Sequence, residues 1–261
     1  MDAQALNVPV TFVFSLAAAA ALTVCAAKAR LQLDRRLCLM AAAVMVLVLA
    51  AQFVSRSVAP GVSVHLVGGA LAAMLVGPWA GTFTLALVAV LHSVLGDAGL
   101  SALGPNVVNL AILGTLGAYL VVVLLLKVLP KNPDGLAATA LIASIAGVVA
   151  ATSGYLIEYA LGATASQPVA MIVEAQLMIG IGEGLITATV VVVVARFRPG
   201  LVYVLGGYPR RVRHRAPGPN FRRRSHIVAP PSWDPTQQGG LFRIARRRTD
   251  GAAAQSPRHH R

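Results

Sequence analysis

Apolar residues fill the first two hundred positions in long, nearly unbroken runs that polar residues interrupt only briefly. Each run has close to the ~20 residues that an α-helix needs to cross a hydrocarbon layer roughly 30 Å thick. The runs show no alternation of apolar and polar positions, so they predict helices and not a barrel. We predict seven membrane-spanning helices, over residues 8–27, 37–54, 64–79, 81–97, 106–128, 136–160 and 169–195.

Glycine and proline mark the joints between these helices. The string Gly77-Pro78-Trp79-Ala80-Gly81 separates the third and fourth runs and predicts a tight turn at one membrane face. The pattern as a whole predicts an all-α fold, a polytopic transmembrane helical bundle. Further breaks occur at Pro60-Gly61, Gly104-Pro105, Pro133-Asp134-Gly135 and Pro168.

Composition supports the membrane assignment, because 57% of the residues are hydrophobic and only 12% are charged. A soluble domain carries roughly 25% charged residues, so this chain has too little polar material to cover a soluble surface. No basic residue precedes the first run, and we expect a retained span in place of a cleaved signal peptide. Cys25 and Cys38 lie within apolar runs and are predicted to be small buried residues.

The formal net charge of +13 belongs to the C-terminal segment. Residues 1–195 hold seven Lys or Arg and seven Asp or Glu, whereas the segment from Arg196 holds fifteen Arg against two Asp. We divide the chain into a transmembrane domain, 1–205, and a basic tail, 206–261, whose composition predicts disorder. Three interpretations of the tail stay open: attraction to anionic lipid or nucleic acid, a solvated segment, and a frameshifted sequence. No specific nucleic-acid partner is predicted.

The positions of Lys and Arg predict the orientation of the bundle. Four lie in the loop 28–36 and two in the loop 127–135, and with seven spans both loops share a side with the C-terminal segment. The opposite side holds only Arg56. Because cytoplasmic loops are enriched in Lys and Arg, we predict an N-terminus outside and a C-terminus in the cytoplasm.

Polar residues within the predicted spans gather toward the outer side. Such residues are costly in a bilayer and rarely persist without a partner, which makes them the first candidates for a functional site. We predict an outward-facing polar pocket, with the alternative that each residue only reaches interfacial water. The set comprises His65, His92, Asp97, Asn106, Asn109, Glu158, Tyr159, Glu174 and Gln176.

Glu183 differs from this set because it lies near the middle of the last predicted span. Gln176, Gly180, Glu183 and Thr187 share one helical face, where small residues allow close helix approach. We expect the Glu183 carboxyl to be hydrogen-bonded or protonated inside the bundle. A structural contact and a direct contact with substrate both stay open.

The sequence offers no catalytic constellation. It has neither a Walker A string nor a His-Glu-x-x-His string, so any use of ATP must come from a partner. Ser153 stands beside a glycine but has no neighbouring base. We therefore predict a membrane protein that is not itself an enzyme.

One long string resembles a known signature. Residues 63–81, which include His65 and the Gly-Gly-Ala and Gly-Pro-Trp-Ala-Gly stretches, resemble the CbiM/NikM family, the substrate-binding components of energy-coupling-factor (ECF) cobalt and nickel transporters. Residues 96–109, 179–187 and 29–36 are similar to the same family. The resemblance covers about 8–205, in order and at plausible spacing.

The resemblance implies a seven-helix component of a bacterial inner (plasma) membrane transporter that captures a divalent metal on the outer face. The metal, Co²⁺ or Ni²⁺, is implied as transported substrate, and no cofactor is implied. The implied partners, besides membrane lipid, are a transmembrane coupling (T) subunit, a pair of ATPase subunits and often a small auxiliary membrane subunit. The choice between cobalt and nickel stays open.

The resemblance also implies a ligand set. In the family the metal is held by the N-terminal amine, the amide and imidazole of a His at the second residue, and a His that corresponds to His65. This chain begins Met1-Asp2, so a carboxylate replaces the second-residue imidazole, and Gln176 stands where the family often has a further His. We take Met1, Asp2 and His65 as candidate metal ligands. Candidates for the surrounding shell are His92, Asn106, Asn109, Gln176 and Glu183.

Three explanations of the missing His stay open. Oxygen from Asp2 with one imidazole would bind Ni²⁺ more weakly than a nitrogen set, which would alter the metal preference. Alternatively, the chain is a divergent structural membrane subunit that binds no metal. The third explanation is an incorrect start site.

Overall fold

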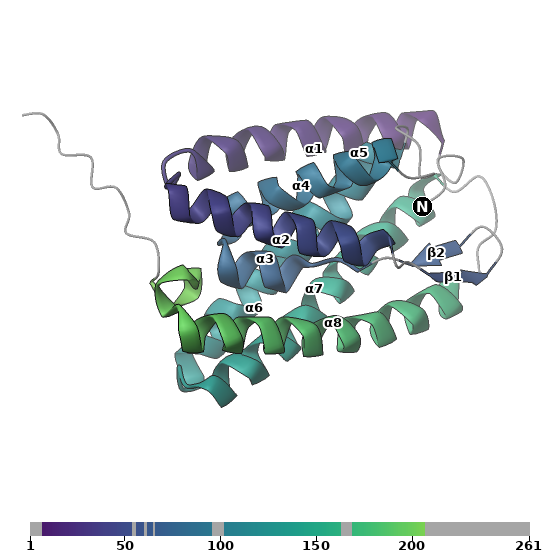
Figure 1. The fold of residues 1–261 in the computed structure, drawn as a ribbon. Coiled ribbons are helices and arrows are strands. Elements are labelled where there is room, and N and C mark those ends of the chain that lie inside the picture. The colour runs from purple at the N-terminus through teal and green to yellow at the C-terminus, as the bar shows by residue number, and fades with distance from the viewer. Residues whose placement is uncertain are drawn as a thin grey trace, which may run out of the picture. The chain divides into compact units, whose positions relative to one another are not determined.

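The computed structural model describes residues 7–53, 56–59, 62–64, 66–95, 102–162 and 169–206. These residues form a bundle of helices with one short hairpin (Figure 1). The elements, in chain order, are α1 (Val8–Ala29), α2 (Arg35–Phe53), β1 (Arg56–Ala59), β2 (Val62–Val64), α3 (Gly69–Leu75), α4 (Pro78–Leu95), α5 (Leu103–Asn106), the π-helical η2 (Val107–Leu113), α6 (Gly114–Val128), α7 (Pro133–Gly162), α8 (Val169–Phe197) and the 3₁₀ turns η3 (Pro199–Leu201) and η4 (Tyr203–Leu205).

Six helices of the described chain are long and apolar enough to cross a membrane, which confirms the all-α, multi-pass class. Their bounds agree with six of the seven predicted spans to within a few residues. The agreement reflects the length of the apolar runs, since each run both spans the hydrocarbon layer and satisfies its own backbone as a helix. The six are α1, α2, α4, the continuous α5–η2–α6 stretch, α7 and α8.

The remaining predicted span, 64–79, is wrong as a continuous helix. β2 ends at Val64, residues 66–68 are irregular, and before α4 begins at Pro78 only the seven residues of α3 are helical. Seven residues rise about 10 Å, far less than a bilayer core. The error has a physical cause: hydropathy reports that a segment is buried, and α3 is buried in protein on every side, not in lipid.

This broken segment, residues 66–77, still runs lengthwise through the bundle. Val67 lies beside Glu183 of α8, and a side chain at Gly68 would meet Val48 of α2. A side chain at Gly77 would meet Tyr203, which follows the end of α8. The segment from Val67 to Gly77 therefore travels alongside the second half of α8.

The turn between α3 and α4 is shorter than the predicted Gly77–Gly81 turn. Gly77 has φ of 96°, a left-handed conformation that favours glycine. Pro78 is already the first residue of α4, where its missing N–H is not needed and its fixed φ suits the helix. The reversal is thus confined to Val76 and Gly77.

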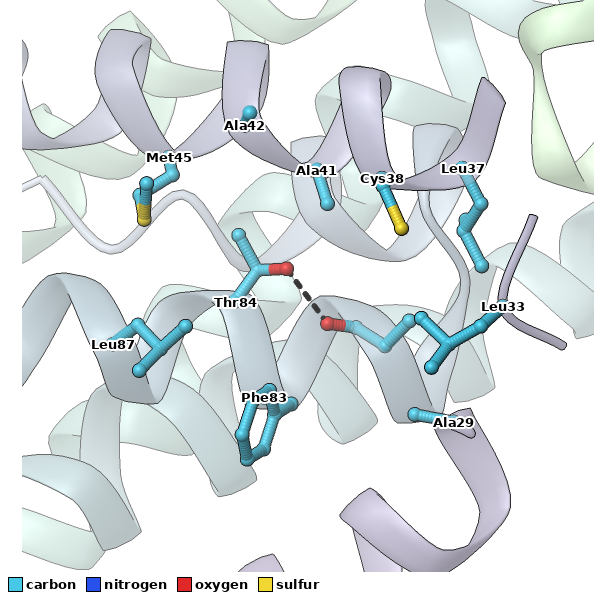
Figure 2. A pocket seen from close by; sticks show the side chains of 11 residues that line it. Ala29, Leu33, Leu37, Cys38, Ala41, Ala42, Met45, Phe83, Thr84 and Leu87 are labelled. Atoms are coloured by element: carbon cyan, nitrogen blue, oxygen red, sulfur yellow. Dashed lines mark hydrogen bonds between the residues drawn. The ribbon is translucent and has the colours of Figure 1, made fainter. Parts of the chain in front are cut away.

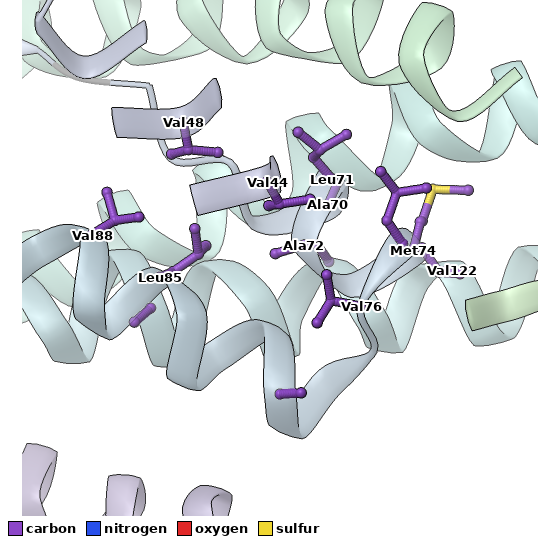
Figure 3. Close-up of a cluster of buried hydrophobic side chains, with 14 of the residues drawn as sticks. Val44, Val48, Ala70, Leu71, Ala72, Met74, Val76, Leu85, Val88 and Val122 are labelled. Carbon is purple, nitrogen blue, oxygen red and sulfur yellow. The ribbon is translucent and has the colours of Figure 1, made fainter. Parts of the chain in front are cut away.

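The core is built around α3 from small residues. All seven residues of α3 are buried, and Val44 and Val48 of α2 face α3 and α4 in the same cluster (Figure 3). A side chain at Gly69 would overlap the Gly114 carbonyl group, so the two backbones approach at this point. Small residues replace the packing that large side chains provide in soluble cores.

Both ends of α1 are tied down. The side-chain oxygen of Asn7 accepts a hydrogen bond from the Val10 N–H at 3.1 Å, which caps the helix. The Asn7 N–H donates to the Gly162 carbonyl at 2.8 Å and joins the start of α1 to the end of α7. At the other end Lys28 Nζ lies 3.8 Å from the centroid of the Trp79 ring.

Two sequence predictions have different outcomes here. Cys25 is buried as predicted, but the prediction for Cys38 is wrong: it is exposed, because it lines an open groove between α2 and α4. The predicted tail, 206–261, falls outside the described residues apart from Gly206, so its disorder stays a prediction. The orientation of the termini also stays a prediction.

Candidate functional site

The three candidate metal ligands, Met1, Asp2 and His65, lie outside the described residues, and so does Asp97. Their neighbours along the chain are described: Leu66 follows His65, and Asn7 precedes α1. Among the residues that the structure describes, no three His, Cys, Asp or Glu side chains come together as a metal-binding group. The described part of the candidate site is therefore the backbone that directly follows His65.

The backbone of that segment is held by two side chains from distant helices. The Val67 N–H donates to Glu183 Oε2 at 2.9 Å, and the Gly68 N–H also hydrogen-bonds the Glu183 carboxylate. On the other side Gln52 Nε2 donates to the Leu66 carbonyl oxygen at 3.1 Å. Non-helical backbone at membrane depth is tolerated only where the protein satisfies its polar groups. Glu183 and Gln52 meet that requirement.

We predicted a Glu183 carboxyl that is hydrogen-bonded or protonated inside the bundle, and the hydrogen bond is confirmed. Only 1% of its surface is exposed, and Gly180 and Thr187 on the same helical face are also buried. Gly180 and Gly184 allow close packing against Val148 and Leu141 of α7. Glu183 thus makes a structural contact, because its carboxylate hydrogen-bonds the backbone two and three residues after His65.

Gln52 was missed by sequence reasoning. Its signal was available, since it is the only uncharged polar side chain in α2 apart from Cys38, and it stands in an otherwise apolar run. It is 3% exposed. A buried polar group in a membrane helix requires a partner, and here the partner is a carbonyl group 14 residues further along the chain.

A second buried polar contact joins η2 to α7. Asn109 Nδ2 donates to Glu158 Oε2 at 2.8 Å, and both residues are buried, with Glu158 fully so. Asn109 belongs to the π-helical stretch, a local widening that is frequent at functional sites. Glu158 Oε1 and Asn109 Oδ1 have no hydrogen-bond partner within the described part of the chain. The pair therefore retains acceptor capacity.

The polar residues of the predicted pocket fall into separate contacts. Asn109 and Glu158 meet each other, and His92 lies against Phe53 with ring centroids 5.6 Å apart. Gln176 lines a small cavity of about 100 Å³ between α7 and α8. A single pocket that unites them stays a prediction, because His65 and residues 96–101 are not among the described residues.

The other members of the set differ in exposure. Tyr159 is partly buried, with its ring 6.3 Å from that of Tyr155 one turn earlier. Asn106 is also partly buried, and Glu174 is exposed. In Figure 1 the end of α2, the hairpin and the start of α8 lie at one end of the bundle. The polar residues thus come from neighbouring helix ends.

Comparison with known proteins identifies what the chain resembles. The family model described as "CbiM: Cobalt uptake substrate-specific transmembrane region" matches residues 1–201. A protein of Archaeoglobus fulgidus named as a fused nickel transport protein, NikMN, is 33% identical over 59% of this chain and 52% of its own length. The cobalt transport protein CbiM of Geobacter sulfurreducens is 31% identical over 56% of this chain and 44% of its own length. This chain thus spans about half the length of these two relatives.

A metal transport protein of Haloquadratum walsbyi is 31% identical over 60% of this chain and 71% of its own length. Two crystal structures also have the same fold. One is titled a transition metal transporter and aligns with a TM-score of 0.64 at 21% identity, over 76% of this chain and 91% of its own. The other, a truncated transition metal transporter, has a TM-score of 0.64 at 22% identity. At this identity the structures show the fold.

Proposed function

This chain belongs to the CbiM family, and we propose that it is the membrane-embedded substrate-binding component of an ECF transporter that imports cobalt or nickel. The observation that carries the proposal is the fixed segment after His65, whose backbone is bonded to Glu183 and Gln52. Two buried polar side chains hold non-helical backbone inside the bundle. A segment that only spanned the membrane would be a helix and would need neither of them. We therefore infer a further role for this segment.

We propose that the metal is held by the His65 imidazole, the amine of Met1 and the carboxylate of Asp2. Imidazole and amine nitrogens suit Ni²⁺ and Co²⁺, and a carboxylate is a usable oxygen ligand for both. His65 binds a metal only as neutral imidazole, so acid weakens capture. His92, Asn106, Asn109, Gln176 and Glu183 would act around these ligands, Glu183 by fixing the backbone next to His65.

The remaining parts of the transporter would come from partners. The chain has no phosphate-binding motif, so a pair of ATPase subunits would hydrolyse ATP and a transmembrane coupling subunit would transmit the movement. A small auxiliary membrane subunit would complete the assembly. The setting of this proposal is a bacterial inner membrane, with the capture site outside and the C-terminus in the cytoplasm.

Metal binding by the purified full-length protein tests the role of His65. Loss of an outer-shell partner typically costs 10–100-fold in metal affinity, so His65→Ala, which removes a ligand, should cost at least about 100-fold. His214→Ala, in the basic tail, is the matched control and should bind Co²⁺ or Ni²⁺ like the wild type. Calorimetry with either metal gives the Kd. Equal affinity of wild type and His65→Ala would contradict the assignment.

A second function is favoured by one observation, the carboxylate of Asp2 in place of the family's imidazole. In that case the chain assembles with the coupling subunit as a structural component and captures no metal. Co-purification with the coupling subunit, together with absence of Co²⁺ and Ni²⁺ uptake by the complete complex, would support this function. Uptake that depends on His65 would exclude it.

A further inference from the structure

A groove of about 250 Å³ lies between α2 and α4, beside the last residue of α1 and the turn that follows it. α1 and α2 each pack against α4, and the groove follows the first half of α2 from the turn that joins α1 to α2 (Figure 2). Its walls include Leu33, Ala42, Met45, Phe83 and Leu87. Leu33, Phe83 and Leu87 are 49%, 38% and 43% exposed, so the groove opens to the surface.

The lining favours hydrocarbon over water or a polar ligand. The side chains that line the groove contribute only two polar atoms, the Cys38 thiol and the Thr84 hydroxyl. Thr84 Oγ1 already donates to the Ala80 carbonyl oxygen at 2.8 Å (Figure 2). A buried water needs two to four polar partners, which this lining does not supply. An apolar chain fits the groove better.

The mouth of the groove carries positive charge. Lys28, Arg30, Arg35 and Arg36 all lie in or beside the turn between α1 and α2, and all four are exposed. Arg30 directly follows Ala29, and Arg35 lies about one helical turn before Cys38, and both Ala29 and Cys38 line the groove. Asp34 is the only acidic residue in this stretch. An apolar groove below a net positive rim matches a ligand with an acyl chain and an anionic head.

We propose that this groove binds an anionic phospholipid, with one acyl chain between α2 and α4 and the phosphate against Arg30 and Arg35. A partner helix is the poorer fit, because a helix with its side chains is about 10 Å across and would not enter a groove of this volume. The proposal does not depend on metal binding, since the groove and the segment that follows His65 share no residue.

Cys38 provides a direct measure of occupancy. It lines the groove and is exposed, whereas Cys25, the only other cysteine in the sequence, is buried. The full-length protein in detergent is treated with N-ethylmaleimide, and alkylation of each cysteine is followed by mass spectrometry. Phosphatidylglycerol at about ten times its Kd should slow alkylation of Cys38 about tenfold, because a bound lipid covers the thiol. Phosphatidylcholine with the same acyl chains should leave the rate unchanged.

Two neighbouring substitutions test the groove itself. Ala42 lines it, whereas Ala43 is exposed on α2 outside it. Ala42→Leu should fill the groove and abolish the effect of phosphatidylglycerol on Cys38, and Ala43→Leu should retain it. Both positions are exposed, so both variants should fold, which thermal unfolding in detergent verifies.

Two pairs of charges test the rim. Arg30→Gln with Arg35→Gln should raise the Kd for phosphatidylglycerol about tenfold to thirtyfold, since each basic side chain near an anionic lipid surface contributes to attraction. Lys127→Gln with Lys131→Gln removes the same charge from the turn between α6 and α7, where both side chains are exposed, and should leave that Kd unchanged.

Three results would overturn the proposal. Equal protection by phosphatidylglycerol and phosphatidylcholine would show that the head group is not recognised. Protection that survives in Ala42→Leu would place the lipid elsewhere, for example on the Arg-rich tail. A Cys38 that reacts freely with phosphatidylglycerol present, but is protected when the coupling subunit is co-expressed, would assign the groove to a protein.

Discussion

Glu183 is the residue on which the broken segment depends. Its carboxylate accepts hydrogen bonds from the Val67 and Gly68 N–H groups, which no helix or strand satisfies. Two buried N–H groups without partners cost about 1–3 kcal/mol each. The partnership spans 116 positions in the sequence, so it links α8 to a segment far from it in the chain.

Glu183→Leu should therefore lower the free energy of unfolding by about 2–5 kcal/mol and weaken metal binding, because the backbone next to His65 loses its support. Glu174→Leu is the matched control, since Glu174 is on the same helix but exposed, and it should change stability by less than about 0.5 kcal/mol. Thermal unfolding in detergent and calorimetry with Ni²⁺ measure the two effects. Equal stability of the two variants would remove Glu183 from this role.

The Asn109–Glu158 pair makes a second prediction at this scale. A hydrogen bond to a charged or buried carboxyl group contributes about 1.5–3 kcal/mol, and removal of one partner leaves the other unsatisfied. A double-mutant cycle with Asn109→Ala and Glu158→Ala should thus give a coupling energy of at least about 1 kcal/mol in detergent unfolding. Additive effects of the two substitutions would mean that the 2.8 Å contact contributes nothing to stability.

At the scale of single elements, Gly69 of α3 and Gly182 of α8 have opposite roles. A Cβ at Gly69 would overlap the Gly114 carbonyl group, whereas a Cβ at Gly182 would meet nothing within 4 Å. Gly69→Ala should destabilise the protein by about 1–3 kcal/mol, because backbone cannot yield as a side chain does. Gly182→Ala should be neutral or stabilise by up to about 1 kcal/mol through helix propensity. Unfolding midpoints in the same detergent compare the pair, and a shift of the same sign for both would refute the packing argument.

The same elements show what the sequence could and could not reveal. Hydropathy located six spanning helices because length and apolarity alone decide whether a segment crosses a bilayer. It failed at 64–79 because a core of protein is as apolar as lipid, so the break at Gly68 left no mark on the apolar run. The hairpin of β1 and β2 was missed for a related reason: its four and three residues are too short to give a pattern.

For the site, the sequence predicted that the Glu183 carboxyl is inside the bundle and either hydrogen-bonded or protonated, since no charge persists at that depth alone. It could not name Val67 and Gly68 as partners, because the pairing depends on how the helices pack. The role of Gln52 was missed for the same reason. Pairing of Asn109 with Glu158 likewise required the approach of η2 to α7.

At the scale of the whole molecule, the broken segment decides the topology. From the turn at 30–34 to the end of α8 the chain passes through α2, the broken segment 66–77, α4, the α5–α6 stretch, α7 and α8. Six crossings would return the chain to the side of that turn, and five would not. The segment runs alongside the second half of α8, from Glu183 onward, and ends beside Tyr203, which follows α8. We therefore count it as one of the six crossings.

Single cysteines in a Cys25→Ala, Cys38→Ala background test this count. Leu31→Cys lies in the turn after α1 and Arg198→Cys follows α8, and both positions are exposed. With an odd total of crossings both should resist a membrane-impermeant maleimide in intact cells and react after permeabilisation, as the positive-inside rule predicts. Val8→Cys, 82% exposed at the start of α1, should react in intact cells. Reaction of Leu31→Cys and Arg198→Cys from opposite sides would mean that the segment 66–77 enters and leaves the bundle at the same face. In that case His65 and the N-terminus need not share a side of the membrane.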